Sequence, residues 1–329
     1  MMPRDKGSSK NILCSCRILA GLIIGVIAIA TFGTIAYAQD IKHKMFNSPR
    51  QAFNALVEAT RDNDTTALLA IFGPEGKDII SSGDVVADER ARERFVKAAG
   101  EAVKFSKLDN KTVLVVIGKD KWPFAVPIVK SGKQWIFSTK EGREEVLNRR
   151  IGRNELNTIR ICLTYVTAQR EYAAKDRDGD GVLQFAQHFL SNKGKKDGLY
   201  WDAAPGEEMS PMGPVIAHAS EEGYPVKKHE KPVPYHGYYF KILKGQGPNA
   251  SGGENDYVNN GKMTGGFALV AYPARYGVSG VMTFMVNQRG IVYEKNLGPQ
   301  TEEIARAITK YDPDKTWIKV EIIKSGLAK

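Results

Sequence analysis

The segment at positions 176–187, DRDGDGVLQFAQ, carries the residue types with the clearest capacity for chemistry. Aspartates at its first, third and fifth positions and a glycine at its sixth match the pattern in which carboxylates converge on a calcium ion, while the backbone carbonyl at position seven adds an oxygen. We therefore predict a metal site formed by Asp176, Asp178, Asp180, the Val182 carbonyl and Gln187.

The twelfth position of this loop decides how tightly an ion would be held. A glutamate there usually supplies a charge and two oxygens, whereas Gln187 offers one neutral oxygen. We expect weak binding of Ca²⁺ with a structural role, in which the ion fixes the turn between a helix at 152–174 and a short helix at 185–191. The alternative is a solvated acidic turn that ends the first helix without metal.

Few other residues have a spacing suited to catalysis. The five histidines show no H-x-x-H or H-E-x-x-H spacing, which argues against zinc, and the sequence has no G-x-S-x-G or Walker-type loop. The first half has only His43, at its start, so an enzyme there would depend on carboxylates such as Asp84 or Glu89. A cavity lined by two or more ionisable groups with displaced pKa values would favour such an enzyme.

Aromatic residues offer a second kind of site. They either form an exposed surface for a glycan or peptide, or belong to the core of strands, and the sequence leaves both interpretations open. The same alternatives hold for Trp122 and Phe124, which stand beside prolines. The residues of the proposed surface are Tyr200, Trp201, Tyr235, Tyr238 and Tyr239.

Composition limits the class of protein and its partners. A hydrophobic fraction of 42% and a charged fraction of 26% are those of a globular chain, and 329 residues suit two domains. The net charge of +10 is scattered and forms no basic stripe with interleaved aromatics, so we expect no nucleic acid among the partners.

The first 38 residues have the pattern of an export signal. A basic start precedes the uncharged run 18–35, and Ala36 and Ala38 form an A-x-A ending, which predicts a signal peptide cut after Ala38. Uncleaved, residues 18–38 would be an anchor in the inner membrane. Either way the protein is expected in the periplasm or elsewhere outside the cytoplasm. Cys162 then remains alone and is predicted to be a buried thiol.

The order of the predicted elements indicates an α+β fold. Ser48, Pro49 and Gln51 form a helix start with a capping box. Further helices are expected after Asp64 and over 87–105, followed by strands at 111–118, 122–130 and 133–139. We predict a cone-like domain over 43–145, with N-terminal helices on a curved antiparallel sheet.

A second domain is predicted over 146–321. A charged helical stretch at 140–152 precedes the helix at 152–174, which would pack on an antiparallel sheet. The strands of this sheet are expected within 235–245, 264–274 and 279–298. Between them, the proline density of 202–234 predicts an irregular excursion.

Three family resemblances follow from these stretches. ALVEATRDNDTTALLAIF with PIVKSGKQWIFST resembles nuclear transport factor 2-like domains. The helix NELNTIRICLTYVTAQREYAA, followed by antiparallel strands, resembles pilin and pseudopilin heads, although the charged EEVLNRRIGR before it departs from their apolar helix and makes polymerisation doubtful. From about 43 to 321 the chain resembles a secreted bacterial family, domain of unknown function 2950. The stretches IISSGDVVADERARERFV, LNRRIGRNEL, YVTAQREYAAKDRDGDGVLQFAQ and GGFALVAYPARYGVSGVMTFMVNQRGIVYEKNLGP carry this resemblance.

The resemblance implies a location outside the cytoplasm and no established activity. We therefore expect a non-enzymatic binding or scaffold module of the cell envelope, which recognises a protein, peptide or glycan and contains a structural calcium loop. The alternative is a periplasmic hydrolase that uses carboxylates in the cavity of the first domain.

Overall fold

The computed structural model describes residues 43–226 and 232–321, which belong to one compact unit. The predicted signal or anchor at 1–38 lies outside the described residues. Within the described ranges, no helix has both the length and the apolar character needed to cross a membrane.

The chain begins with helices that are capped by their own side chains. Ser48 Oγ accepts a hydrogen bond from Gln51 N, which confirms Ser48 as the N-cap. Gln51 Oε1 accepts from Asn47 N, one residue before the N–H that a capping box would use, so the reciprocal bond of the predicted capping box is not formed. Asp64 caps the second helix through Ala67 N at 2.9 Å. The helical elements of this part are α1 (Pro49–Arg61), α2 (Thr65–Phe72), the 3₁₀ turn η1 (Pro74–Gly76), α3 (Lys77–Ile80) and α4 (Val85–Glu101).

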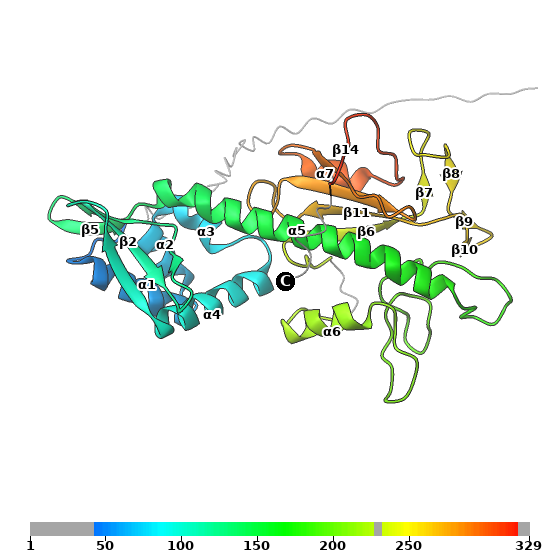
Figure 1. Ribbon diagram of the computed structural model, residues 1–329, viewed down its shortest axis with the longest axis horizontal. Helices are drawn as coiled ribbons and strands as arrows, with labels where there is room; N and C mark the ends of the chain where they lie inside the picture. The colour runs from blue at the N-terminus through cyan, green and yellow to red at the C-terminus, as the bar shows by residue number, and fades with distance from the viewer. Residues whose placement is uncertain (1–42, 227–231, 322–329) are drawn as a thin grey trace, which may run out of the picture. The chain divides into compact units, whose positions relative to one another are not determined.

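An antiparallel sheet follows these helices (Figure 1). Its strand order is β1-β2-β4-β5, with β3 also paired to β2. Alternate residues of β2, Val113, Val115 and Ile117, are buried, and the last two pack with α1 and α2 residues such as Phe53 and Ile71 in a first hydrophobic core. The strands are β1 (Val103–Lys107), β2 (Thr112–Ile117), β3 (Trp122–Pro123), β4 (Ile128–Ser131) and β5 (Gln134–Phe137).

One long helix, α5 (Thr139–Ala173), replaces the two helical stretches predicted at 140–152 and 152–174. Its first half contacts η1 and α3, and its second half contacts β11 and β12 (Figure 1). Cys162 is fully buried on this helix, as predicted. The boundary proposed at 145/146 falls inside α5, and the division into two domains stays a prediction.

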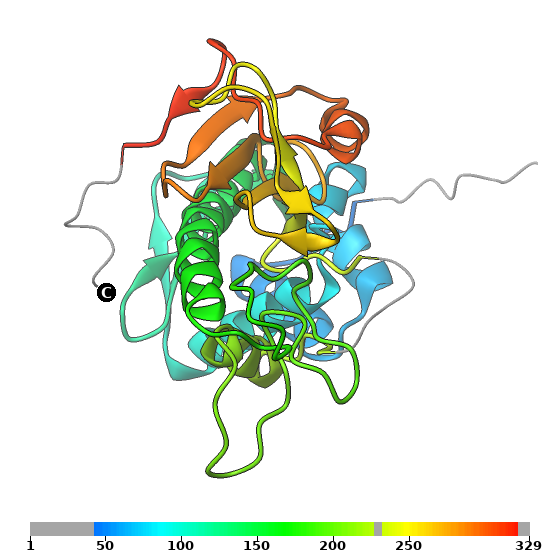
Figure 2. The ribbon, with the colours of Figure 1, turned by 90° about the vertical axis from the view of Figure 1, so that its right-hand side faces the viewer.

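The second sheet lies along one side of α5, as Figure 2 shows with the sheet in orange and yellow. Its order is β14-β13-β12-β11-β6, all antiparallel. Tyr165 and Val166 of α5 join Leu269 and Phe284 in a second hydrophobic core. The strands are β6 (Tyr238–Leu243), β11 (Ala268–Pro273), β12 (Met282–Asn287), β13 (Tyr293–Asn296) and β14 (Ile318–Lys319), and α7 (Thr301–Ala307) follows β13.

Short pairs of strands and one helix complete this half. The two-stranded sheets pair β7 (Gly245–Gln246) with β8 (Asn255–Asp256) and β9 (Val258–Asn259) with β10 (Lys262–Met263). Helix α6 (Gly213–Glu221) lies within the stretch that was predicted to be irregular. The mixed helices and antiparallel sheets confirm the α+β class.

The helix predicted at 185–191 is wrong. Phe185 N donates to Met263 O at 2.8 Å, and both backbone groups of Ala186 hydrogen-bond to the side-chain amide of Gln169. These tertiary hydrogen bonds satisfy the backbone that a helix would otherwise satisfy internally. Trp201 and Tyr238 are also buried in the second core, so these two aromatics do not belong to an exposed surface.

Candidate ligand cavity and acidic loop

The acidic loop follows α5 and folds around the carboxylate of Asp176. Asp176 Oδ1 accepts a hydrogen bond from Gly179 N at 2.8 Å, and Oδ2 accepts one from Gly181 N at 2.7 Å. Both glycines have positive φ angles, +75° and +85°, which glycine adopts at the least cost. The hydrogen bond from Gly181, supported by that from Gly179, lowers the pKa of the Asp176 carboxyl group.

Three aspartates of this loop form a cluster that could hold a metal ion. Asp176, Asp178 and Asp180 are exposed and place carboxylate oxygens within 4.8 Å of one another. Lys262 of β10 faces the same cluster: its Nζ pairs with Asp180 and lies 3.7 Å from Asp178 Oδ2. An incoming cation must therefore compete with an ammonium group that already balances part of the charge.

The other two predicted ligands lie in different surroundings. Val182 N donates to Asp180 Oδ1 at 3.0 Å, which keeps Val182 beside the cluster. Gln187 Nε2 donates to Gly261 O at 2.7 Å, and its Oε1 accepts from Lys244 Nζ at 3.0 Å. The structure thus brings the three aspartates together and engages the Gln187 amide with two other residues.

Arg177, the second residue of the loop, fixes its start. Its side chain is 5% exposed, and its Nη1 lies 3.0 Å from Glu208 Oε2. The guanidinium carbon lies 5.0 Å from the ring centroids of both Tyr172 and Trp201, a cation–π arrangement. The calcium-loop pattern assigns Arg177 no role, so the sequence alone does not indicate these contacts.

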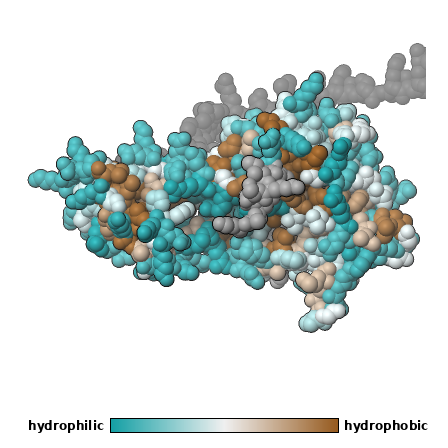
Figure 3. All heavy atoms as spheres, viewed as in Figure 1, coloured by the Kyte–Doolittle hydropathy of each residue, from teal (hydrophilic) through white to brown (hydrophobic). Residues whose placement is uncertain are grey.

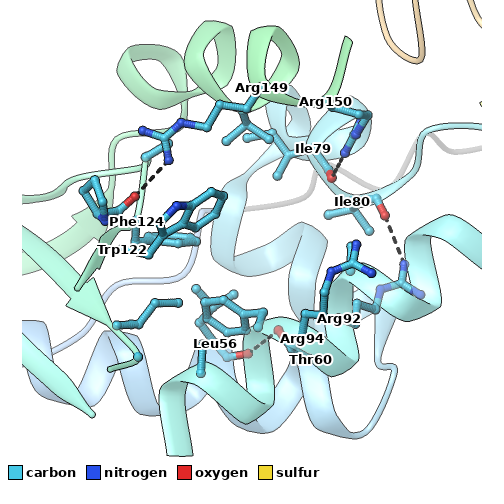
Figure 4. A pocket seen from close by; sticks show the side chains of 18 of the residues that line it. Leu56, Thr60, Ile79, Ile80, Arg92, Arg94, Trp122, Phe124, Arg149 and Arg150 are labelled. Carbon is cyan, nitrogen blue, oxygen red and sulfur yellow. Dashed lines mark hydrogen bonds between the residues drawn. The ribbon is translucent and has the colours of Figure 1, made fainter. Parts of the chain in front are cut away.

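A cavity of about 540 Å³ lies in the first half of the described chain. This volume is within the range of small-molecule sites, roughly 300–1,000 Å³. Helices α1, α2, α4 and α5 contribute to it, together with the end of β2 and β3 (Figure 4). Apolar residues form much of its wall: Leu56, Leu68, Phe72, Ile79, Ile80, Phe95, Ala98, Ile117, Trp122, Phe124 and Val146.

The apolar wall follows from the amphipathic helices. Leu56, Leu68 and Phe72 are core residues whose inner surface continues into the cavity. The rings of Phe95 and Phe124 lie 5.5 Å apart and extend this surface. The molecular surface in the view of Figure 3 is mostly hydrophilic, with hydrophobic groups over the first sheet and its helices and others over the second half.

Five arginines line the same cavity: Arg92, Arg94, Arg149, Arg150 and Arg153. Three of them are held by carbonyl groups. Arg150 donates to Asp78 O and Ile79 O, both at 2.6 Å, and Arg92 donates to Ile80 O at 3.0 Å. Arg149 donates to Pro123 O at 3.0 Å and its guanidinium lies 5.1 Å from the Trp122 ring centroid (Figure 4).

Arg94 and Arg153 differ from these three. Neither makes a hydrogen bond or an ion pair with another described residue. Both side chains line the cavity and remain exposed to solvent. Partial desolvation, with the positive charge of Arg94, lowers the pKa of Arg153. Burial also lowers the pKa of Arg150, and the positive charge of Arg153 lowers it further. Arginines stay protonated at neutral pH, so two cations without a protein counter-ion stand at this cavity.

The carboxylates of the cavity are Asp88, Glu101 and Asp120. Asp88 Oδ2 accepts from Ser82 N at 2.8 Å, and burial raises the pKa of the Asp88 carboxyl group. The carboxylates suggested by the sequence lie elsewhere. Asp84 is buried and caps α4, while Glu89 is exposed, and neither lines the cavity.

The arginine cluster had a signal in the sequence. Arg149 and Arg153 are four residues apart in LNRRIGRNEL, a spacing that places both side chains on one face of a helix. The sequence alone shows the spacing on α5 but not that α4 brings Arg92 and Arg94 to the same cavity.

The described chain is therefore an α+β protein with a largely apolar cavity and an acidic metal-type loop. It belongs to the DUF2950 family, described as a protein of unknown function, whose model matches residues 43–320. Comparison with curated proteins and with solved structures gives no match. The resemblances to nuclear transport factor 2-like domains and to pilin heads are thus not confirmed.

Proposed function

We propose that the protein is exported to the cell envelope and binds a small ligand there without transforming it. The cavity of about 540 Å³ is the observation that carries this proposal. Its apolar wall and its few charged groups have the character of a ligand site. Protein, peptide or glycan partners then reach the protein through its outer surface, in keeping with a scaffold role.

The side chains of the cavity favour binding over catalysis. Its lining contains no His, Cys, Ser, Lys or Tyr among the described residues. The displaced pKa values belong to two arginines, which keep their charge, and to Asp88. An arginine that never releases its proton orients an anion but does not act as a general base.

A hydrolase is the second candidate, and Asp88 favours it. Its pKa is raised by burial, as in carboxylates that act as general acids or bases. Hydrolysis of p-nitrophenyl decanoate separates the two functions. The binding proposal expects equal rates for the wild type and Asp88→Asn, whereas a rate lost in the variant would favour the hydrolase.

We further propose that the acidic loop binds Ca²⁺ weakly through Asp176, Asp178, Asp180, the Val182 carbonyl and Gln187, with a structural role. Extracellular calcium modules have dissociation constants on the order of 0.1–1 mM. At tenfold excess over the dissociation constant, calcium would stabilise the fold by about 1.4 kcal/mol. Thermal melts of the wild type and Asp178→Ala, with calcium and with chelator, test this. A wild-type midpoint that ignores several millimolar calcium would refute it.

Native mass spectrometry of the full chain purified from an envelope extract tests the cavity. We expect a bound small molecule in the wild type and its loss in Ala98→Phe, because Ala98 lines the cavity. Ala102→Phe is the matched control, since Ala102 is exposed at the end of α4 and outside the lining. Equal ligand content in both variants would contradict the proposed site.

Export is tested separately. The intact mass of the exported protein should correspond to a chain that starts at Gln39. A full-length mass, with the protein kept in the membrane after a carbonate wash, would instead show that residues 18–38 are retained as an anchor.

A further inference from the structure

We propose that the ligand of this cavity is an amphiphilic anion, with a single apolar body that ends in a carboxylate or a phosphate ester. Arg94 and Arg153 would bind the anionic group. This inference rests on the proposed binding function and names the chemical class of the ligand.

The two unpaired guanidinium groups indicate that the ligand carries a negative charge. Arg94 lies on α4 and Arg153 on α5, and the charge of Arg94 disfavours the charged state of Arg153. Holding like charges close together costs free energy unless an anion lies between them. Neither group has a carboxylate partner among the described residues. Because both side chains are exposed, water and salt screen part of this repulsion. An anionic group bound beside them would replace that screening with direct charged contacts.

The geometry of the guanidinium group limits the chemical classes of anion that fit this site. A guanidinium offers its N–H donors in a planar fork that fits carboxylates and phosphates by paired hydrogen bonds. Neither Arg94 nor Arg153 is held by an acceptor among the described residues, so the donors of both remain open to a head group in this cavity. Arg92, Arg149 and Arg150 are instead held by backbone carbonyls, and they contribute charge from fixed positions.

The cavity wall determines the other end of the ligand. Beyond the arginines it consists largely of aliphatic and aromatic side chains, including Leu56, Phe95, Phe124 and Val146. Thr60 lines it too, but its hydroxyl donates to Leu56 O at 2.7 Å within α1. A ligand body with many polar groups would lose hydration along this apolar wall, so the wall favours an alkyl or aryl body.

Calorimetry with the full chain and four amphiphiles tests this class. The probes are decanoate, decyl phosphate, decan-1-ol and decyltrimethylammonium, each below its micelle concentration, with acetate and inorganic phosphate as head groups without a chain. We expect decanoate or decyl phosphate to bind at least roughly tenfold more tightly than decan-1-ol, as charged hydrogen bonds imply. The ranking of the two anions identifies a carboxylate or a phosphate ester as the preferred head.

The variant Arg94→Gln/Arg153→Gln locates the head group. It should lose that tenfold preference for the anions and bind decan-1-ol as tightly as the wild type does. Its melting midpoint should not fall, because neither side chain forms a hydrogen bond or an ion pair with another described residue. Arg61→Gln is the control, because it removes a positive charge from the exposed end of α1, outside the lining, and it should leave binding of the anions unchanged.

The outcomes separate this inference from the proposed function. Equal binding of decan-1-ol and the anions, or a preference for the ammonium, would overturn the ligand class while leaving the cavity a binding site. Binding of acetate or phosphate as tight as that of the amphiphiles would also overturn it, because the apolar body would contribute nothing. If the wild type and Ala98→Phe both bind none of the probes, the ligand class and the binding function fail together.

Discussion

Asp78 on α3 and Arg275, in the loop after β11, form an ion pair across 197 positions of sequence, with Arg275 Nη2 2.7 Å from Asp78 Oδ1. Arg143 of α5 pairs with the other oxygen of the same carboxylate. Arg275 also donates to Ser81 O at 2.8 Å, and Arg150 donates to Asp78 O. The short segment around α3 is therefore held from α5 and from the second sheet at once.

We predict that Asp78→Asn destabilises the fold by about 1–3 kcal/mol at neutral pH, the range for hydrogen bonds to charged groups. Burial alone would raise the pKa of Asp78, but the hydrogen bonds from Arg143 and Arg275 outweigh it and lower the pKa below 3.8. The folded state thus binds the proton less readily than the unfolded state. The contribution is complete above the unfolded pKa and is lost as the pH falls through the folded one.

Urea titrations of wild type and variant over this pH range measure the difference. It should shrink below pH 3.8 as the wild-type carboxylate becomes protonated. Glu58→Gln is the control, because Glu58 is exposed on α1 and has no ion pair among the described residues. A difference that does not change with pH would show that Asp78 acts through packing and not through its charge.

Asp84→Ala should cost more than an ordinary helix cap. Asp84 is 1% exposed, and its carboxylate accepts from Ala87 N, Tyr224 OH and Gly237 N at 3.0, 3.0 and 2.7 Å. Its removal leaves buried donors without an acceptor, and we expect a loss of about 2–4 kcal/mol in the free energy of unfolding. Asp64→Ala removes an exposed cap on α2 and should cost about 1 kcal/mol. Equal losses in denaturant titrations would mean that Asp84 acts only as a cap.

Local signals were sufficient for the beginnings of the helices. Ser48 and Asp64 accept the capping hydrogen bonds that their types predict, from Gln51 N and Ala67 N. The turn at Gly132, with φ +62°, joins β4 and β5 as expected from SGK. These features depend on residues that are close together in the sequence, so a local sequence pattern is sufficient to predict them.

Predictions failed where distant residues or prolines decide the structure. The strand predicted at 122–130 is divided into β3 and β4, and Pro123 and Pro127, which lack an N–H donor, lie at its breaks. Similarly, the amide of Gln169 holds Ala186 in extended form. No local pattern in FAQHFLS reports a hydrogen bond to a residue 17 positions away.

The candidate sites show the same distinction. The aspartates at 176, 178 and 180 are close in sequence and in space. By contrast, Lys262, which balances part of their charge, comes from β10. The cavity needs α4, α5 and the β2–β3 turn to meet, and only the tertiary fold brings Arg94 and Arg153 to one place.

Lys262→Met should strengthen calcium binding by the acidic loop. The variant removes an ammonium group that pairs with Asp180 and lies 3.7 Å from Asp178, so calcium no longer displaces a cation. We expect a roughly tenfold lower dissociation constant, equal to about 1.4 kcal/mol, and a lower melting midpoint in chelator because the aspartates then repel one another. Lys193→Met, a change at an exposed lysine without an ion pair among the described residues, is the control for charge. Equal calcium titrations of the two variants would show that Lys262 does not compete.

Two glycines of α5 should respond in opposite directions to the same substitution. A Cβ on Gly142 would lie 2.5 Å from Val126 Cα and 2.7 Å from Ala125 O, whereas a Cβ on Gly152 would meet nothing within 4 Å. Gly142→Ala therefore forces the backbone at 125–126 away from the helix, and we expect a loss of about 1–3 kcal/mol. Gly152→Ala gains helix propensity and should stabilise by up to about 1 kcal/mol. Urea titration measures both changes on one helix, so the gain at Gly152 shows how much propensity alone contributes. If Gly142→Ala stabilised the protein as Gly152→Ala does, then α5 would not pack closely on residues 125–126, and the wall of the cavity at Ala125 would have to be reconsidered.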